Sequence, residues 1–258
     1  MNIRKQLMVT VGVILWVTAL PARADIDARI YWGKRVAMGF TVSGTVDRVP
    51  VEAGTAAKKG EMLMSLEQTP FRTAVVEAKA ALAQATGARK ESRRDYTQTK
   101  ELYDRGLLST VELENAQLKK ESSEAAFIAA QARLERAQYE LSRSAIHAPF
   151  DGLVLSRNVS VGQSIVSTQQ VETLLTFAAR GEYVARGLVG SKTLRDVRIG
   201  DSATVKANGK TFSGKISAIG LEPVDSLQKG DPRYELSVRF NSADVLLRAG
   251  TDASIDLK

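Results

Sequence analysis

The stretch that decides the fold runs from Phe71 to Ala145 and reads FRTAVVEAKAALAQATGARKESRRDYTQTKELYDRGLLSTVELENAQLKKESSEAAFIAAQARLERAQYELSRSA. It contains no proline and only two glycines, Gly87 and Gly106. Apolar and small residues recur at alternating spacings of four and three, which is the heptad pattern of a coiled coil. The seam positions are Phe71, Val75, Ala78, Leu82, Ala85, Arg89, Ser92, Tyr96, Thr99 and Tyr103, then Leu113, Ala116, Lys120, Ser123, Phe127, Ala130, Leu134, Ala137 and Leu141. The pattern predicts an antiparallel coiled-coil hairpin over residues 69–145.

The seam is apolar near the root of the hairpin and polar midway along it. There Arg89 and Ser92 on the first arm are expected to lie opposite Lys120 and Ser123 on the second. Residues 71–105 as one helix would extend ~52 Å at about 1.5 Å per residue. A rod of that length predicts a protein that reaches toward a partner.

The ends of the two arms are marked by capping residues. Thr69 is expected to cap the first arm, with Pro70 at the first helical position, where a missing N–H has no cost. Gly106 supplies the left-handed residue that closes this arm. Ser109 and Glu112 have the spacing of a capping box and are expected to begin the second arm.

Short glycine-punctuated strands lie on both sides of the hairpin, and the two sets repeat one another. Both sets read Gly-x-Val, at Gly44 to Val46 and again at Gly152 to Val154, and a second Val and a second Gly follow at equal distances. Neither half can bury an apolar face alone, so residues 40–68 and 146–178 are predicted to pair as one split β domain. The glycines are interpreted as turn residues with positive φ.

The C-terminal part, residues 179–258, returns to short strands. Asn208-Gly209 predicts a β-hairpin over residues 205–216, and a brief helix is expected at residues 191–197. Five or six strands of this kind usually close on themselves. The prediction is therefore a C-terminal β-barrel.

The N-terminus is typical of a secretory signal peptide over residues 1–24. Arg4 and Lys5 precede an apolar run from Leu7 to Leu20, and Ala22-Arg23-Ala24 provides a cleavage site. The run is shorter than the ~20 residues that span a bilayer, although a retained anchor stays open as the alternative. The mature chain is expected to begin at Asp25, with residues 25–39 as an N-terminal segment.

The composition argues against several classes of function. Cysteine is absent and His147 is the single histidine, which disfavours thiol chemistry and multi-histidine metal sites. The formal charge of +7 falls to +4 when Arg4, Lys5 and Arg23 leave with the signal, which is too mild to indicate nucleic-acid binding. We therefore expect no enzyme, no cofactor and no bound metal.

The arrangement resembles the periplasmic adaptor family, also called membrane fusion proteins, of bacterial tripartite efflux systems. The matching residues are Ser43-Gly44-Thr45-Val46, Val51-Glu52-Ala53-Gly54 and Lys59-Gly60, then Ile146-His147-Ala148-Pro149-Phe150-Asp151-Gly152 and Val161-Gly162. The resemblance implies a multidomain, mainly β fold: a split lipoyl-like domain, a helical hairpin and a β-barrel.

The resemblance also implies a function in export. A periplasmic adaptor of this family assembles with itself, as a trimer or hexamer ring, and bridges an inner-membrane transporter and an outer-membrane channel. It associates with the inner membrane through its partner and serves the efflux of small molecules. A resistance-nodulation-division (RND) pump is the favoured partner, with an ATP-driven (ABC) or other secretion exporter as the alternative.

Many relatives build a further membrane-proximal domain from both chain ends. Only residues 25–39 precede the first half here, and the sequence ends at Lys258 after the predicted barrel. This domain is therefore expected to be absent or vestigial.

The hairpin tip is the predicted docking site for the outer-membrane channel. Relatives that dock to such channels carry an Arg, a Leu four residues later and a Ser seven after that. Leu102 and Ser109 match this spacing, whereas Gln98 stands in the Arg position, so Arg105 or Lys100 would have to supply the charge. The predicted docking residues are Leu102, Arg105, Leu107, Leu108 and Ser109.

A simpler alternative for the tip stays open. Leu102 would pack in the seam and Ser109 would only cap the second arm, which is worth ~1 kcal/mol. Exchanging Ser109 for Asp or Asn is expected to separate the two interpretations, because both residues are good caps.

Two other classes of protein compete with the adaptor. A lipoyl or biotinyl carrier has a modified lysine, but no Met-Lys-Met or Asp-Lys-Ala triplet occurs in the sequence. A coiled-coil chaperone or scaffold would expose apolar residues at its tip, and Leu107 and Leu108 are compatible with that. The signal peptide and the split β domain favour the adaptor.

Overall fold

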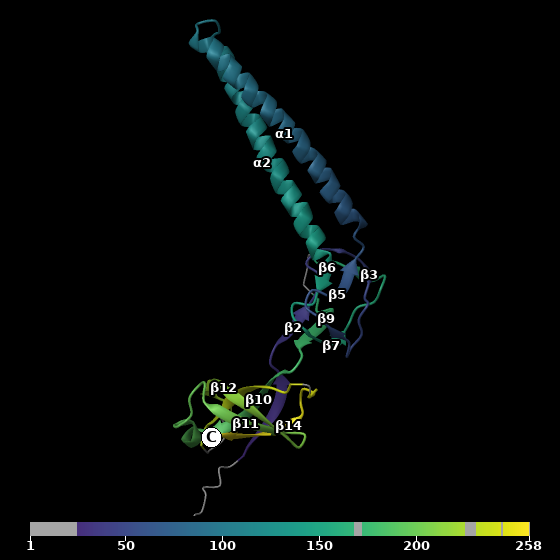
Figure 1. Cartoon of the computed structure of the whole chain (residues 1–258), viewed down its shortest axis with the longest axis vertical. Coiled ribbons are helices and arrows are strands. Elements are labelled where there is room, and N and C mark those ends of the chain that lie inside the picture. The colour runs from purple at the N-terminus through teal and green to yellow at the C-terminus, as the bar shows by residue number, and fades with distance from the viewer. Residues whose placement is uncertain (1–24, 168–171, 225–230, 244, 258) are drawn as a thin grey trace, which may run out of the picture. The chain divides into compact units, whose positions relative to one another are not determined.

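The structure is a computed structural model that describes residues 25–167, 172–224, 231–243 and 245–257, so the predicted signal peptide lies outside the described residues. The described residues divide into two compact units, one within Trp32–Tyr183 and Ser242–Leu247, and one that comprises the other described residues. The fold class is confirmed as mainly β with a helical hairpin and a β-barrel (Figure 1).

Helices α1 (Thr69–Asp104) and α2 (Thr110–Arg143) form the hairpin and lie side by side in Figure 1. Every predicted seam position on both helices is buried or half-buried. The most enclosed are small residues, among them Ala116, Ala130 and Ala137. Small side chains let the two helices approach closely, and the predicted heptad seam is confirmed.

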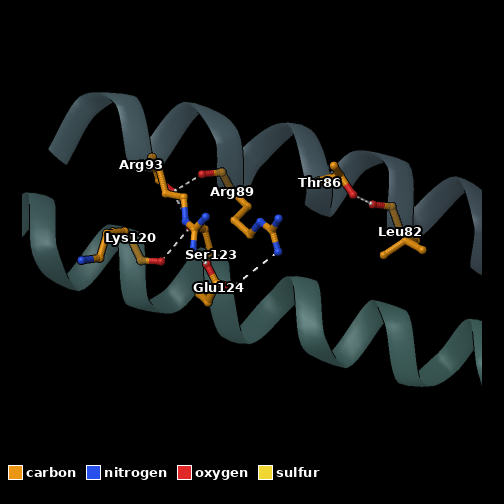
Figure 2. Close-up of polar contacts among 8 residues, drawn as sticks. Leu82, Thr86, Arg89, Arg93, Lys120, Ser123 and Glu124 are labelled. Carbon is orange, nitrogen blue, oxygen red and sulfur yellow. Dashed lines mark hydrogen bonds and ion pairs between the residues drawn. The ribbon is translucent and has the colours of Figure 1, made fainter. Parts of the chain in front are cut away.

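The middle of the seam is polar, as predicted. The hydroxyls of Ser92 and Ser123 are hydrogen-bonded to each other across the hairpin, and Ser92 is 1% exposed. Arg89 and Arg93 from α1 both reach Glu124 on α2, at 3.4 and 3.1 Å (Figure 2). Each hydroxyl also lies within hydrogen-bond distance of a carbonyl of its own helix, that of Arg89 for Ser92 and that of Lys120 for Ser123. The contact across the hairpin and the two ion pairs of Glu124 together favour this register of the two helices.

Aromatic rings extend this polar segment. The Arg89 guanidinium lies 3.8 Å from the ring centroid of Phe127, and the Lys120 ammonium lies 4.0 Å from that of Tyr96. Each contact joins one helix to the other, and cations over aromatic faces are attracted by the ring quadrupole. The charged seam residues thus have partners across the seam.

The start of α1 differs from the prediction. Thr69 is already helical, and the cap is Gln68, whose carbonyl accepts the first helical hydrogen bond from Arg72 N at 2.9 Å. Pro70 therefore stands at the second helical position. No side chain caps this end. The prediction was wrong because Gln68 takes a helical conformation, which moves the boundary back by one residue.

The two halves of the split β domain build two four-stranded sheets, in the orders β2-β9-β7-β4 and β6-β5-β3-β8. Before the hairpin lie β2 (Arg35–Met38), β3 (Gly44–Arg48), β4 (Ala56–Ala57) and β5 (Met62–Leu66). After it lie β6 (Ala145–His147), β7 (Gly152–Arg157), β8 (Ser164–Ile165) and β9 (Leu175–Ala179). Each sheet takes two strands from each half, so the predicted pairing of the halves is confirmed.

The sequence repeat appears as a pair of reciprocal hydrogen bonds. Gly54 N–H donates to the Val154 carbonyl and Gly162 N–H donates to the Val46 carbonyl, each at 2.8 Å. Gly54 and Gly162 have φ of +92° and +84°, a conformation that only glycine adopts readily. Val46 and Val154 are both 1% exposed in a shared apolar core. The equivalent residues of the two halves therefore hold one another.

Strand β3 begins later than the sequence suggested. Residues 40–43 form no strand, and the strand starts at Gly44. Phe40 is nevertheless 2% exposed and belongs to the core. Phe40 is therefore apolar because it is a buried loop residue, and not because it occupies the inward position of a strand.

The root of the hairpin is held by backbone contacts. Leu66 N–H donates to the Ser144 carbonyl at 2.8 Å, and β5 pairs with β6 so that Met64 lies opposite Ile146. Ser144 is fully buried. The residues that enter α1 and leave α2 are thus tied together within the sheet.

The second unit is a closed six-stranded barrel with the order β1-β10-β13-β12-β11-β14. Its elements are β1 (Ile26–Trp32), β10 (Glu182–Gly190), α3 (Ser191–Leu194), β11 (Ser202–Ala207), β12 (Lys210–Pro223), β13 (Arg233–Asn241) and β14 (Asp252–Leu257). Asn208 and Gly209 both have positive φ between β11 and β12, which confirms the predicted hairpin. Helix α3 is shorter than the predicted span of residues 191–197.

The predicted N-terminal segment, residues 25–39, is divided between the two units. Strand β1 pairs with β14, with Ile26 opposite Ile255, and so completes the barrel. Strand β2 pairs with β9 and belongs to the split β domain.

A second boundary also differs from the prediction. Residues 242–247 were predicted to lie within the barrel, but they group with the unit that contains the split β domain. There Leu247 N–H donates to the buried Tyr183 hydroxyl at 3.0 Å. These pairings join residues far apart in the sequence, so local patterns do not show them.

Two glycine substitutions are expected to change the free energy of unfolding in opposite directions, one in strand β7 of the split β domain and one in helix α1. A Cβ on Gly152 would lie 2.2 Å from the Ala178 carbonyl oxygen, whereas a Cβ on Gly87 meets nothing within 4 Å. Gly152→Ala is expected to lower the free energy of unfolding by about 2–3 kcal/mol through overpacking. Gly87→Ala is expected to raise it by about 0.5–1 kcal/mol by improving helix propensity. Chemical denaturation measures both, and an unaffected Gly152→Ala would contradict the close approach of β7 and β9.

Candidate docking site at the hairpin tip

The tip is the turn of residues 105–109 between the end of α1 and the start of α2. Gly106, with φ of +75°, closes α1 as predicted, and its N–H donates to the Tyr103 carbonyl at 2.8 Å. The five predicted docking residues all lie in this turn or in the last turn of α1. Leu107 is 67% exposed, Arg105 and Ser109 are exposed, and Leu108 is half-buried.

Leu102 does not pack in the seam. The seam passes through Thr99 and Tyr103, and Leu102 is 39% exposed beside them. The alternative that explained Leu102 by packing between the helices is therefore wrong. An exposed Leu next to the turn instead adds to the apolar surface that the tip offers.

Val111 extends this surface and is not among the docking residues that the sequence predicts. It lies in the first turn of α2 and is 63% exposed. Its heptad position points away from the seam residue Leu113, which is the sequence signal that would have identified it. Leu102, Leu107 and Val111 give the tip three exposed apolar side chains.

Ser109 and Glu112 form the predicted capping box. Ser109 donates from its backbone N–H and from its hydroxyl to Glu112 Oε2, both at 2.8 Å, and Glu112 N–H donates to Ser109 Oγ at 3.4 Å. The backbone N–H bond, followed by the hydroxyl bond, lowers the pKa of Glu112 below its ordinary value. The first turn of α2 is thus fixed by a charged, hydrogen-bonded cap.

This geometry changes the choice of substitution at Ser109. An Asp at this position would bring its own carboxylate against that of Glu112, and like charges at contact distance repel. An Asn can both accept from the Glu112 N–H and donate to its carboxylate. Asn is therefore the more closely matched replacement of the two.

The cationic residues near the tip are free to meet a partner. Within the described part of the chain, neither Arg105 nor Lys100 forms an ion pair. Both are exposed, as is Gln98. The tip therefore combines apolar side chains with an exposed positive charge.

The described residues offer little evidence of a metal site or a membrane span. They contain no group of three or more His, Asp or Glu side chains placed to hold a metal ion. One hollow of about 1240 Å³ lies in the barrel unit and is lined by mixed charges such as Asp27, Arg186 and Glu235. No helix of the described ranges is both long and apolar enough to cross a bilayer.

The fold and the hairpin place the chain in a known class of protein. The sequence profile of the CzcB-like, barrel-sandwich hybrid domain family matches residues 35–175, which is more than half of the chain. The chain belongs to this family, and the resemblance to membrane fusion proteins is confirmed.

Individual relatives agree with this placement. The chain is 27% identical over 235 residues to the uncharacterized protein YdhJ of Escherichia coli, covering 90% of this chain and 81% of that one. It is 27% identical over 245 residues to the multidrug resistance protein MdtA of Cronobacter turicensis, covering 88% of this chain and 58% of that one. It therefore spans little more than half the length of this MdtA.

A solved structure shares the fold. The membrane fusion protein Spr0693 from Streptococcus pneumoniae superimposes with a TM-score of 0.70 at 15% identity, covering 91% of this chain and 98% of that one. At that identity the similarity establishes the fold alone.

The lowered pKa of Glu112 predicts how the tip responds to acid. A carboxylate whose pKa is lower in the folded state stabilises that state above its unfolded pKa, and this contribution is lost as the pH falls through the folded pKa. The cap is therefore expected to loosen below the ordinary value of 4.5. The backbone amide resonance of Ser109, followed by NMR, should shift with this titration in the wild type and not in Glu112→Gln. Titration of Glu112 at or above 4.5 would contradict the assigned hydrogen bonds.

Proposed function

We propose that the chain is a periplasmic adaptor that assembles with itself and joins an inner-membrane exporter to an outer-membrane channel. The observation that carries the proposal is the hairpin, whose root is tied into a split β domain and whose tip exposes Leu102, Leu107 and Val111. Exposed apolar side chains at the end of a rod are suited to docking on another protein. The adaptor acts by binding and alignment, with no bond chemistry.

The exported cargo is proposed to be small molecules. The relative MdtA is named a multidrug resistance protein, and the family match covers the split β domain together with the hairpin. An RND pump is the proposed inner-membrane partner, with an ABC-type exporter as the alternative. The proposed location is the periplasm, reached through a signal peptide of residues 1–24 and held at the inner membrane by the partner.

Site-directed crosslinking in native membranes tests the assembly. A photoreactive residue at Leu107 is expected to capture an outer-membrane channel protein, because this side chain is the most exposed apolar group of the turn. The same residue at Gln84, exposed midway along α1, serves as the matched control and should not capture it. Equal capture from both positions, or capture of no channel protein from Leu107, would overturn docking through the tip.

Charge at the tip is expected to impair export without unfolding the protein. Leu107→Asp changes an exposed side chain, so thermal unfolding should stay within about 1–2 °C of wild type, as for other surface changes. Accumulation of ethidium should rise to the level of cells that lack the protein, because a carboxylate disfavours burial against a channel. Gln84→Asp is the control and should export normally. Wild-type export by Leu107→Asp would count against the proposal.

Ser109 separates capping from docking. Ser109→Asn is expected to keep the capping box and unfold as wild type, whereas Ser109→Ala should lose about 1 kcal/mol. If Ser109 also contacts the channel, both variants reduce crosslinking from Leu107. Full crosslinking by Ser109→Asn would show that Ser109 serves only as a cap, and it would be removed from the docking residues.

A further inference from the structure

A hollow of about 520 Å³ lies at the root of the hairpin, on the side where α1 begins. Its lining comes from β3, from β5, from the turn that contains Val161 and Gly162, and from the first turn of α1. These elements belong to one compact unit, and β3, β5 and the start of α1 are neighbours in Figure 1. This root hollow has the size of a site for a small molecule.

The root hollow contains a buried hydroxyl that has no partner. Ser65 in β5 is 4% exposed, and its hydroxyl has no hydrogen-bond partner among the described residues. Arg48 lies opposite Ser65 on β3, and opposite residues of antiparallel strands have their side chains on the same face of the sheet. Both residues line the root hollow, so the Ser65 hydroxyl faces it. Buried hydroxyls are normally hydrogen-bonded, so this one requires a partner that is supplied from the hollow.

The first turn of α1 brings further donors to the same hollow. Gln68, Thr69 and Arg72 line it, and no side chain caps this end of the helix. The N–H groups of Thr69 and Phe71 have no acceptor in the described part of the chain. Helix α1 has 36 residues, and the N-terminus of a long helix carries a partial positive charge of about half an elementary charge. Free N–H groups at such an end favour the binding of an anion.

Two guanidinium groups add full positive charges. Arg48 and Arg72 line the root hollow, one from β3 and the other from α1. Arg72 donates to Gln68 Oε1 at 2.8 Å and forms no ion pair within the described ranges. Arg48 lies 3.3 Å from the carboxylate of Asp47. A guanidinium has several N–H donors in a planar fork that fits carboxylate and phosphate oxygens, so both side chains keep donors for a ligand.

Carboxylates at the root hollow limit the charge of a ligand. The charge of Asp47 is compensated by Arg48, whereas Glu67 makes no ion pair among the residues that the structure describes. Glu67 N–H donates to the Thr45 carbonyl at 2.8 Å, which holds the backbone of Glu67 beside β3. The Glu67 carboxylate therefore opposes an anion in the hollow. The two guanidinium groups and the helix end together outweigh the two carboxylates, which favours a small anion of low charge.

We propose that the root hollow is a binding site for the phosphate or carboxylate group of a small ligand. The oxygens of this group accept hydrogen bonds from Arg48, from Arg72, from the Ser65 hydroxyl and from the free N–H groups at the start of α1. The site lies at the opposite end of the hairpin from the tip, and the inference does not depend on the docking proposed above.

Binding at this site joins the start of α1 to the split β domain. Helix α2 is followed by β6 after Ser144 alone, whereas Glu67 and Gln68 separate β5 from α1. Gln68 Nε2 lies 3.4 Å from Ser144 Oγ, at the margin of a hydrogen bond. A ligand that contacts β3, β5 and α1 at once therefore stabilises the beginning of the hairpin.

Titration of the purified protein with inorganic phosphate tests the site. Backbone amide resonances of Ser65, Thr69 and Phe71, followed by NMR at constant ionic strength, are expected to shift along a saturating curve. Constant ionic strength separates binding from the screening of charges. The same titration with acetate shows whether a carboxylate is bound as well as a phosphate group.

Four variants examine the contributions of single side chains to the affinity for the bound anion. Arg72→Gln is expected to weaken binding roughly tenfold, because it removes charge-assisted hydrogen bonds, and Ser65→Ala roughly threefold. Glu67→Gln is expected to strengthen binding roughly threefold, because it removes a like charge. Arg133→Gln is the matched control, since Arg133 is exposed on α2 and lies outside the lining of the hollow. It should bind as wild type.

Thermal unfolding gives an independent measurement. Phosphate stabilises proteins in general, so the informative quantity is the difference between variants in phosphate and in chloride of equal ionic strength. The unfolding midpoint of wild type and of Arg133→Gln should rise more in phosphate than that of Arg72→Gln. Equal rises in all three proteins, equal affinities, or no saturable binding of either anion would overturn the site.

Flotation with phosphatidylglycerol vesicles identifies the source of the anionic group. Flotation that is lost in Arg72→Gln assigns the site to a lipid headgroup. Saturable binding of phosphate or acetate without flotation assigns it to a soluble ligand. Neither flotation nor saturable binding would show that the root hollow holds no anion.

Discussion

The reciprocal hydrogen bonds between the two halves of the split β domain are the constraint on which the rest of the structure depends. Gly54 bonds to Val154 and Gly162 bonds to Val46 at equal distances, so each half completes the other. These bonds form only when the segment that follows the hairpin returns to the segment that precedes it. A helical hairpin is a connection whose ends are already adjacent, so its length adds little to the entropy cost of closing the domain. The split domain can therefore carry a long rod.

The middle of the rod determines where its tip lies. The Ser92–Ser123 hydrogen bond joins the two helices at this level, and a slip of one heptad would set Ser92 opposite Ala116 or Ala130. Such a slip would break the contact across the hairpin and the ion pairs of Glu124, although each hydroxyl would keep the carbonyl partner in its own helix. An apolar seam alone would tolerate such a slip, because one heptad resembles the next. The serine pair and the Glu124 ion pairs take the place of apolar contacts there, and they favour the register that sets the level of Gly106 and of the capping box. The position of the tip along the hairpin thus depends on contacts midway along the two helices.

The sequence predicted those features that have a local cause. The heptad seam, the positive φ of Gly106, the Ser109–Glu112 cap and the Asn208-Gly209 turn each depend on a few neighbouring residues. The predictions failed where pairing is long-range: β1 enters the barrel because Ile26 meets Ile255, and Phe40 is buried without belonging to a strand. The seam passes through Thr99 and Tyr103, so Leu102 lies outside the heptad positions that face the other helix. The heptad pattern that predicts the hairpin therefore also predicts the exposure of Leu102.

Stability and recognition are separated on the hairpin. Buried seam positions such as Ala116 and Ala130 hold the helices together, and a larger side chain there would force them apart. Outward positions such as Leu118 contribute little to folding, since substitutions of exposed side chains usually change stability by no more than about 0.5 kcal/mol. Residues that choose a partner can therefore change while the rod stays folded. The fold is likewise shared with Spr0693 at a TM-score of 0.70 although the sequence identity is 15%.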